Sequence, residues 1–248
     1  MWRGLVVVAA VAVFVGSAVA TPINYGDFTG VTMRYQQISE DSGTDPLPLY
    51  NSPTLVGDTL QFNNLSFYSS SSGNAADTTD GNLMGWIEAK VGSVIQSIAF
   101  DEYGDVSLNG SPLKWGYASV TNTIFVQVHE IDRVAVAPFT FTIDMVMTPS
   151  DGDWTLMDDG YGSWDWEGHL LADVTQALRD KGYATGYATK LYFEMDNTLN
   201  TSSETGTSAY IAKKLTDGLK VTASVEVPEP ITVLLMGLGL GLLRVRRG

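Results

Sequence analysis

The side chains best suited to binding chemistry lie between residues 149 and 167, where carboxylates and aromatic rings alternate with glycine. Carboxylates gathered on a glycine-rich loop can hold Ca²⁺, a cation that prefers oxygen ligands. The segment departs from the EF-hand pattern, because Leu156 stands in place of its glycine and Gly162 in place of its bidentate acid. The candidate calcium ligands are Asp151, Asp153, Asp158 and Asp159.

The aromatic residues of the same segment allow a second interpretation. Their rings can stack on sugar rings while the neighbouring acids accept hydrogen bonds from hydroxyl groups. The candidate ligand-binding residues are Trp154, Tyr161, Trp164 and Trp166. A third interpretation is structural: Trp164 and Trp166 are two residues apart, so both can face the same side and cover the edge of the core. The sequence is compatible with all three interpretations.

Recognised catalytic motifs are absent from the chain. It has two histidines, His129 and His169, and no cysteine, which excludes a histidine-rich metal site and a cysteine nucleophile. It contains neither Gly-x-Ser-x-Gly nor His-Glu-x-x-His. We therefore expect no catalytic residues, no enzyme activity and no cofactor other than calcium. A secreted hydrolase of unrecognised type stays as an alternative, because carboxylate pairs are too common here to discriminate.

The charge of the chain is strongly acidic, with 28 acidic and 14 basic residues and a net charge of −14. Without Glu229 and the four arginines at the two ends, 27 acidic and 10 basic residues remain, a net charge of −17. Such a surface repels nucleic acid and attracts divalent cations. We therefore expect no nucleic-acid partner.

Alternation of apolar and polar residues dominates the middle of the chain. A period of two puts one face of a strand in the core and the other in water. We expect strands at 31–38, 59–68, 83–91, 94–101, 105–109, 117–136, 139–148, 191–196 and 219–226. Many antiparallel strands with one short helix predict an all-β fold, a jelly-roll-like antiparallel β-sandwich.

One helix and four long loops complete this prediction. The helix is expected near 168–180, where an apolar stripe is formed by Leu170, Leu171, Val174, Ala177 and Leu178. The loops are expected at 41–58, 69–82, 149–167 and 197–207, where proline, glycine, serine and aspartate are frequent. Gly104 is expected in a turn between two strands.

The N-terminal 20 residues have the pattern of a signal peptide. Arg3 precedes an apolar segment at 5–15, and Ala18 and Ala20 form a small-x-small cleavage site. Cleavage after Ala20 makes Thr21 the first residue of the mature chain. Residues 21–226 then form one secreted domain, which is long enough to bury a substantial core.

The C-terminal segment 227–248 combines three features. It contains the tetrapeptide Val227, Pro228, Glu229 and Pro230, an uncharged apolar run at 231–243, and the basic residues Arg244, Arg246 and Arg247. The run has 13 residues, fewer than the roughly 20 that a membrane-spanning helix needs. Such a segment suits a temporary membrane helix whose basic end stays on the cytoplasmic side.

These residues resemble the PEP-CTERM sorting signal, found in bacteria that produce exopolysaccharide. The resemblance implies that signal peptidase and an exosortase process the chain, with a transient inner-membrane anchor. It also implies export to the cell surface or extracellular matrix. The expected function is structural or adhesive, in the envelope or a biofilm, with polysaccharide as a candidate partner. The alternative is a carbohydrate-binding module that uses the Trp- and Asp-rich loop.

Overall fold

A computed structural model describes residues 21–226. The signal peptide and the sorting segment, with the helices expected in them, lie outside the described residues. Among the residues it describes, no helix is long and apolar enough to cross a membrane.

The regular secondary structure of the described chain is almost all β-strand, with one α-helix and one 3₁₀ turn. The strands are β1 (Ile23–Thr29), β2 (Met33–Asp41), β3 (Thr54–Val56), β4 (Thr59–Phe62), β5 (Tyr68–Ser72), β6 (Ala75–Ala89), β7 (Val94–Asn109), β8 (Gly116–Ile131), β9 (Val134–Asp144), β10 (Val146–Thr148), β11 (Asp153–Thr155), β12 (Gly162–Asp173), β13 (Ala188–Ser203), β14 (Ser208–Lys213) and β15 (Leu219–Glu226). The helix is α1 (Val174–Asp180), and the 3₁₀ turn is η1 (Ser150–Gly152).

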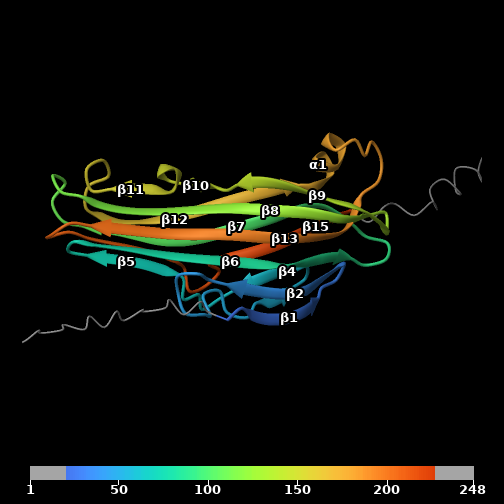
Figure 1. The fold of residues 1–248 in the computed structure, drawn as a ribbon, viewed down its shortest axis with the longest axis horizontal. Helices are drawn as coiled ribbons and strands as arrows, with labels where there is room; N and C mark the ends of the chain where they lie inside the picture. The colour runs from blue at the N-terminus through green and yellow to red at the C-terminus, as the bar shows by residue number, and fades with distance from the viewer. Residues whose placement is uncertain (1–20, 227–248) are drawn as a thin grey trace, which may run out of the picture.

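The strands form two layers (Figure 1). The first layer has the order β1-β2-β6-β13-β8-β9, and β11 pairs with the opposite end of β8. The second layer is built on β7, with β12 and β10 on one side of it. The other side of β7 carries two groups of strands. The first group, β15, β4 and β3, lies along residues 94–102 of β7. The second group, β14 and β5, lies along residues 104–109. All these pairings are antiparallel.

The two layers are joined at their edges. On either side of Met145, β9 pairs with β8 in the first layer and β10 pairs with β12 in the second. At one end, Ala188 of β13 pairs with Ile95 of β7. The long strands β6, β7 and β8 alternate between the layers, as strands do in jelly rolls. The predicted all-β antiparallel sandwich is therefore confirmed, in a form that is nearly closed into a barrel.

The core lies between the layers, where every second side chain of β7 and β13 is buried. One charged pair is part of it: Lys213 forms an ion pair with Glu102, and both side chains are 0% exposed. The Nδ2 atom of Asn197 donates to both carboxylate oxygens of Glu102, at 2.7 and 2.8 Å.

Two segments predicted as loops are largely strands. Residues 69–82 contain most of β5 and the start of β6, and residues 197–203 belong to β13. Many of their inward side chains carry hydroxyls, which bond to each other or to the backbone: Ser69 lies 2.9 Å from Thr201, and Thr79 donates to the backbone oxygen of Tyr68 at 2.7 Å. The loop prediction was wrong because this end of the core contains many polar residues, most of them hydrogen-bonded.

The predicted helix at 168–180 begins later than expected. Strand β12 continues to Asp173, and only residues 174–180 are helical. Leu170 is buried while Leu171 is 64% exposed, which is the alternation of a strand. The helix begins after Asp173, whose carboxylate accepts a hydrogen bond from the backbone N–H of Gln176 at 2.8 Å and so caps the first turn.

Gly104 lies inside β7, not in a turn, and pairs with Trp166 of β12. A Cβ atom at this position would collide with the Trp166 indole and the backbone oxygen of Ala212. Glycine is needed here because the large ring occupies the space above the strand.

Candidate functional site

The residues predicted for sorting lie almost entirely outside the described part of the chain. They are Ala18, Ala20, Val227, Pro228, Glu229, Pro230, Arg244, Arg246 and Arg247. Thr21, the expected first residue of the mature protein, is exposed at the start of the described residues.

The four aromatic residues of segment 149–167 do not form one surface. Trp154 and Trp166 are buried in the core, at 1% and 2% exposure. Trp164 is partly buried and packs against the core, while Tyr161 is 74% exposed. Since β12 starts at Gly162, its alternation turns Trp164 and Trp166 inward. The structure therefore places three of these four rings in or against the core and leaves Tyr161 alone at the surface.

The four aspartates of the same segment make local contacts. Asp153 accepts a hydrogen bond from the hydroxyl of Tyr117 at 2.7 Å. Asp158 and Asp159 accept from the hydroxyl and the backbone N–H of Thr155, each at 2.8 Å. Asp151 lies in η1 at a φ of 51°. Within residues 21–226, no group of three or more His, Asp or Glu side chains is placed to hold a metal ion.

The two histidines lie on opposite layers, and neither contacts a serine hydroxyl. The Nδ1 atom of His169 lies 2.8 Å from Asp101, and its Nε2 atom lies 3.5 Å from Glu167. The hydrogen bond to Asp101 raises the pKa of His169. The Nε2 atom of His129 lies 2.6 Å from the side-chain oxygen of Gln127. The described residues thus hold no Ser-His-Asp arrangement.

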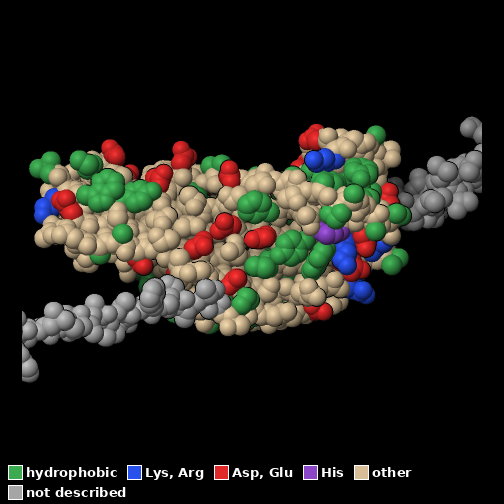
Figure 2. Space-filling view, in the orientation of Figure 1, with side chains coloured by type: hydrophobic (Ala, Val, Ile, Leu, Met, Phe, Trp, Pro, Cys, Tyr) green, Lys and Arg blue, Asp and Glu red, His purple; other side chains and the backbone are tan. Residues whose placement is uncertain are grey.

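A different surface, which the sequence patterns did not indicate, carries aromatic and carboxyl groups side by side. We call it the outer face: the side chains of β6, β13 and β8 that point away from the core. Its members are Asp80, Asn82, Met84, Trp86, Glu88, Thr123, Phe125, Gln127, His129, Lys190, Tyr192, Glu194 and Asp196. In Figure 2, apolar side chains gather in the middle of this face among acidic ones, with a histidine and basic residues near one end.

Antiparallel register brings the members of the outer face into rows. Tyr192 pairs with Trp86 on one side and with Gln127 on the other. In the next row, Glu194 lies between Met84 and Phe125. Residues paired in this way have side chains in contact across the strands.

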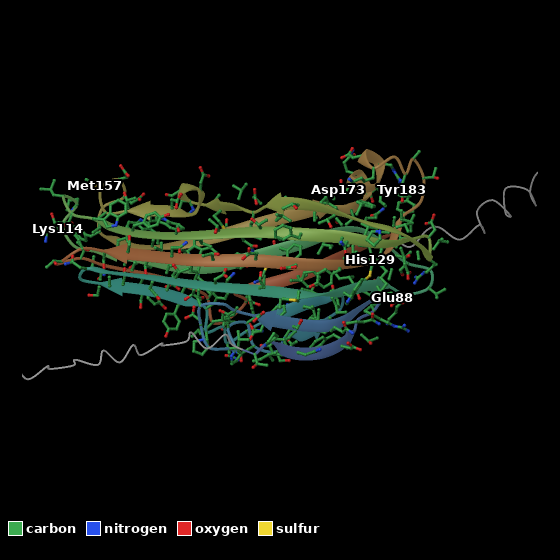
Figure 3. The ribbon with its side chains drawn as sticks, in the orientation of Figure 1. Glu88, Lys114, His129, Met157, Asp173 and Tyr183 are labelled. Atoms are coloured by element: carbon green, nitrogen blue, oxygen red, sulfur yellow. The ribbon has the colours of Figure 1, made fainter. Side chains whose placement is uncertain are left out.

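The aromatic side chains at one end of the outer face contact each other. The Trp86 ring meets His129 and Tyr192 edge to face, at centroid distances of 4.6 and 5.3 Å. The ammonium group of Lys190 lies 5.2 Å from the centre of the Trp86 ring. Partial burial lowers the pKa of His129, and the charge of Lys190 lowers it further. Figure 3 labels His129 and Glu88 at this end of the molecule and Lys114 at the other.

A pair of carboxyl groups lies beside the rings. Burial raises the pKa of Asp196, and Asp80, which is hydrogen-bonded to it, raises it further. The hydroxyl of Thr198 donates to Asp80 at 3.0 Å.

Comparison with known families decides the nature of the C-terminal segment. Residues 226–247 match the family described as the PEP-CTERM protein-sorting motif. The chain carries a PEP-CTERM signal. The resemblance predicted from the tetrapeptide, the apolar run and the arginines is confirmed. A PEP-CTERM signal implies processing by an exosortase and a transient membrane anchor, and so an exported protein.

The remaining comparisons are with curated proteins and with solved structures. No curated protein matches the chain. Among solved structures, TmCBM61 in complex with beta-1,4-galactotriose matches with 8% identity over 65% of this chain and 75% of that chain, at a TM-score of 0.23. Xyn11A of Necallimastix patriciarum, a loop-swap mutant, matches with 11% identity over 82% and 100%, at 0.22. Endoglucanase 3 of Trichoderma harzianum matches with 13% identity over 75% and 98%, at 0.21. Similarities this low carry no argument about fold or function.

Proposed function

We propose that this protein is a surface or extracellular-matrix component with a structural or adhesive role, delivered by its PEP-CTERM signal and an exosortase. The observation that carries the proposal is the match at residues 226–247. The signal peptide expected at residues 1–20 supports it, because export is needed before sorting can occur.

The acidic sandwich agrees with a role outside the cell. Without the terminal segments the chain has 27 acidic and 10 basic residues, so that its surface is hydrated and disfavours self-association. We further propose that the sandwich is not an enzyme. In support, the polar contacts of the two histidines are with Asp101, Glu167 and Gln127, so within the described residues neither is placed to activate a serine hydroxyl. A screen for hydrolysis of polysaccharides and esters by the purified protein tests this point, and turnover would refute it.

The sorting role is tested with a Glu229→Gln variant in the native host. We expect the wild-type protein to lose its C-terminal segment and to be recovered outside the cell. The variant should keep the segment and stay in the membrane fraction, because the tetrapeptide no longer carries its acidic group. Intact mass and cell fractionation measure both outcomes.

A Glu204→Gln variant is the matched control, since it makes the same chemical change within the sandwich. It should be processed and located like the wild type. If Glu229→Gln is also processed and exported normally, the tetrapeptide does not direct sorting and the proposal fails.

A further inference from the structure

We propose that the outer face of β6, β13 and β8 is a binding site for a neutral polysaccharide. This inference deepens the proposed adhesive role, and rests on it, by naming what the protein would adhere to. The site consists of the rings of Trp86, Phe125 and Tyr192 and the polar groups beside them.

The position of the rings is the first argument. Phe125 is 36% exposed in the middle of β8, a strand whose alternate residues Ile124 and Val126 are fully buried. Its exposure therefore adds nothing to the core. Tyr192 lies on the neighbouring strand, two residue pairs along from Phe125 and so in the next row of the same face, and Trp86 lies next to Tyr192. An aromatic ring on a rigid strand is a surface on which the apolar face of a sugar ring can stack.

Polar groups that no protein group occupies lie beside these rings. Asn82, Tyr192 and Glu194 are half-buried on the outer face, and within residues 21–226 their side-chain amide, hydroxyl and carboxylate hydrogen-bond to no other side chain or backbone group, which leaves them open to a ligand. They supply a carboxylate acceptor paired with Phe125, a hydroxyl paired with Trp86, and an amide two residue pairs from Phe125. Sugar hydroxyls both donate and accept, so they match such a mixed set.

The charge of the face decides between classes of ligand. Asp80, Glu88, Glu194 and Asp196 outnumber Lys190 among its charged groups. An anionic polysaccharide would be repelled, and so would a second copy of this chain, whose net charge is −14. An apolar protein partner would bury these carboxylates without counter-charges, which is costly. A neutral polysaccharide meets neither obstacle.

The test uses the full chain purified in a mild detergent and native electrophoresis through gels that contain a polysaccharide. The probes are three soluble neutral polysaccharides, namely galactan, xylan and mixed-linkage glucan, and one anionic polysaccharide, polygalacturonate. We expect at least one neutral polysaccharide to retard the protein and polygalacturonate to leave its mobility unchanged. Retardation by none of the neutral polysaccharides, or equal retardation by polygalacturonate, overturns the inference.

Two alanine variants place the site on the molecule. Phe125→Ala removes a ring of the outer face, and Tyr210→Ala removes a ring of the second layer that is similarly exposed, at 38% against 36%. We expect Phe125→Ala to weaken binding about tenfold, which corresponds to about 1.4 kcal/mol, and Tyr210→Ala to bind like the wild type. Equal losses in the two variants, or no loss in Phe125→Ala, would contradict the assignment. Circular dichroism verifies that both variants are folded.

Failure of this inference is distinguishable from failure of the sorting proposal. Binding is measured on purified protein, so a Glu229→Gln variant should bind as tightly as the wild type even if it is missorted. Correct sorting without polysaccharide binding would remove the outer-face site and leave the sorting proposal intact.

Discussion

Replacing Lys213 by methionine leaves the carboxylate of Glu102 in the core without its counter-charge. Both side chains are 0% exposed, and the Nδ2 atom of Asn197 is then the remaining hydrogen-bond donor to the carboxylate. Removing one partner of a buried ion pair costs about 3–5 kcal/mol, because the other charge stays buried and uncompensated. For a domain of this size, each kcal/mol lowers the Tm by roughly 2–4 °C.

We therefore expect Lys213→Met to lower the Tm by roughly 6–20 °C. A double variant, Glu102→Gln with Lys213→Met, removes both charges and keeps an acceptor for Asn197. It also provides an amide donor for the Oδ1 atom of Asn197, which is buried without a partner. The double variant should lose less than Lys213→Met alone, by about 2 kcal/mol or more.

Thermal unfolding of the full chain in mild detergent, followed by circular dichroism, measures these differences. Lys214→Met is the matched control: its ammonium group lies 3.0 Å from Asp165, and its side chain is 40% exposed. Exposed ion pairs contribute little, so this variant should keep the wild-type Tm within a few degrees. If Lys213→Met behaves like Lys214→Met, or if the double variant loses as much stability as Lys213→Met alone, the two charges are not a coupled buried pair and the reasoning is refuted.

Three further predictions concern packing, protonation and metal binding. A Gly104→Ala variant should lose about 1–3 kcal/mol, because its Cβ overpacks the strand against Trp166; an unchanged Tm would show that the indole lies elsewhere. NMR titration should place the pKa of His169 above 6.5 and that of His129 below it; coinciding titrations would contradict the described contacts. The protonated form of His169 then stabilises the fold below pH 6.5, and this contribution disappears as the pH rises through its folded pKa. EDTA should leave the Tm unchanged, since three of the four loop aspartates already bond to Tyr117 and Thr155; a fall in Tm would reveal a calcium site.

The fold class could be predicted because most strands alternate between apolar and polar residues. Strands whose inward residues are polar could not be predicted in this way. Ser69 and Thr201 are polar but buried, and they hydrogen-bond to each other. Because such residues are typical of loops, β5 and the end of β13 were predicted as loops. The helix prediction was wrong at Leu170 and Leu171, because two adjacent leucines fit a helix as well as a strand. Whether such hydroxyl pairs and neighbouring leucines lie in a strand is decided by partner strands that are distant in the sequence.

The sorting segment could be predicted more completely than the sandwich site because its features are contiguous. The membrane and the processing protease interact with one continuous stretch of chain, which contains the tetrapeptide, the apolar run and the basic end. The outer face has no such stretch: Trp86, Phe125 and Tyr192 are 39 and 67 residues apart in order along the sequence, and only the pairing of β6, β13 and β8 brings them to one face. Within each strand, these rings alternate with buried apolar residues, as Phe125 does with Ile124 and Val126, and so they resemble core residues. The orientation of each residue in the pleated strand distinguishes these outward-facing rings from core residues, because it determines which of two adjacent apolar residues faces water.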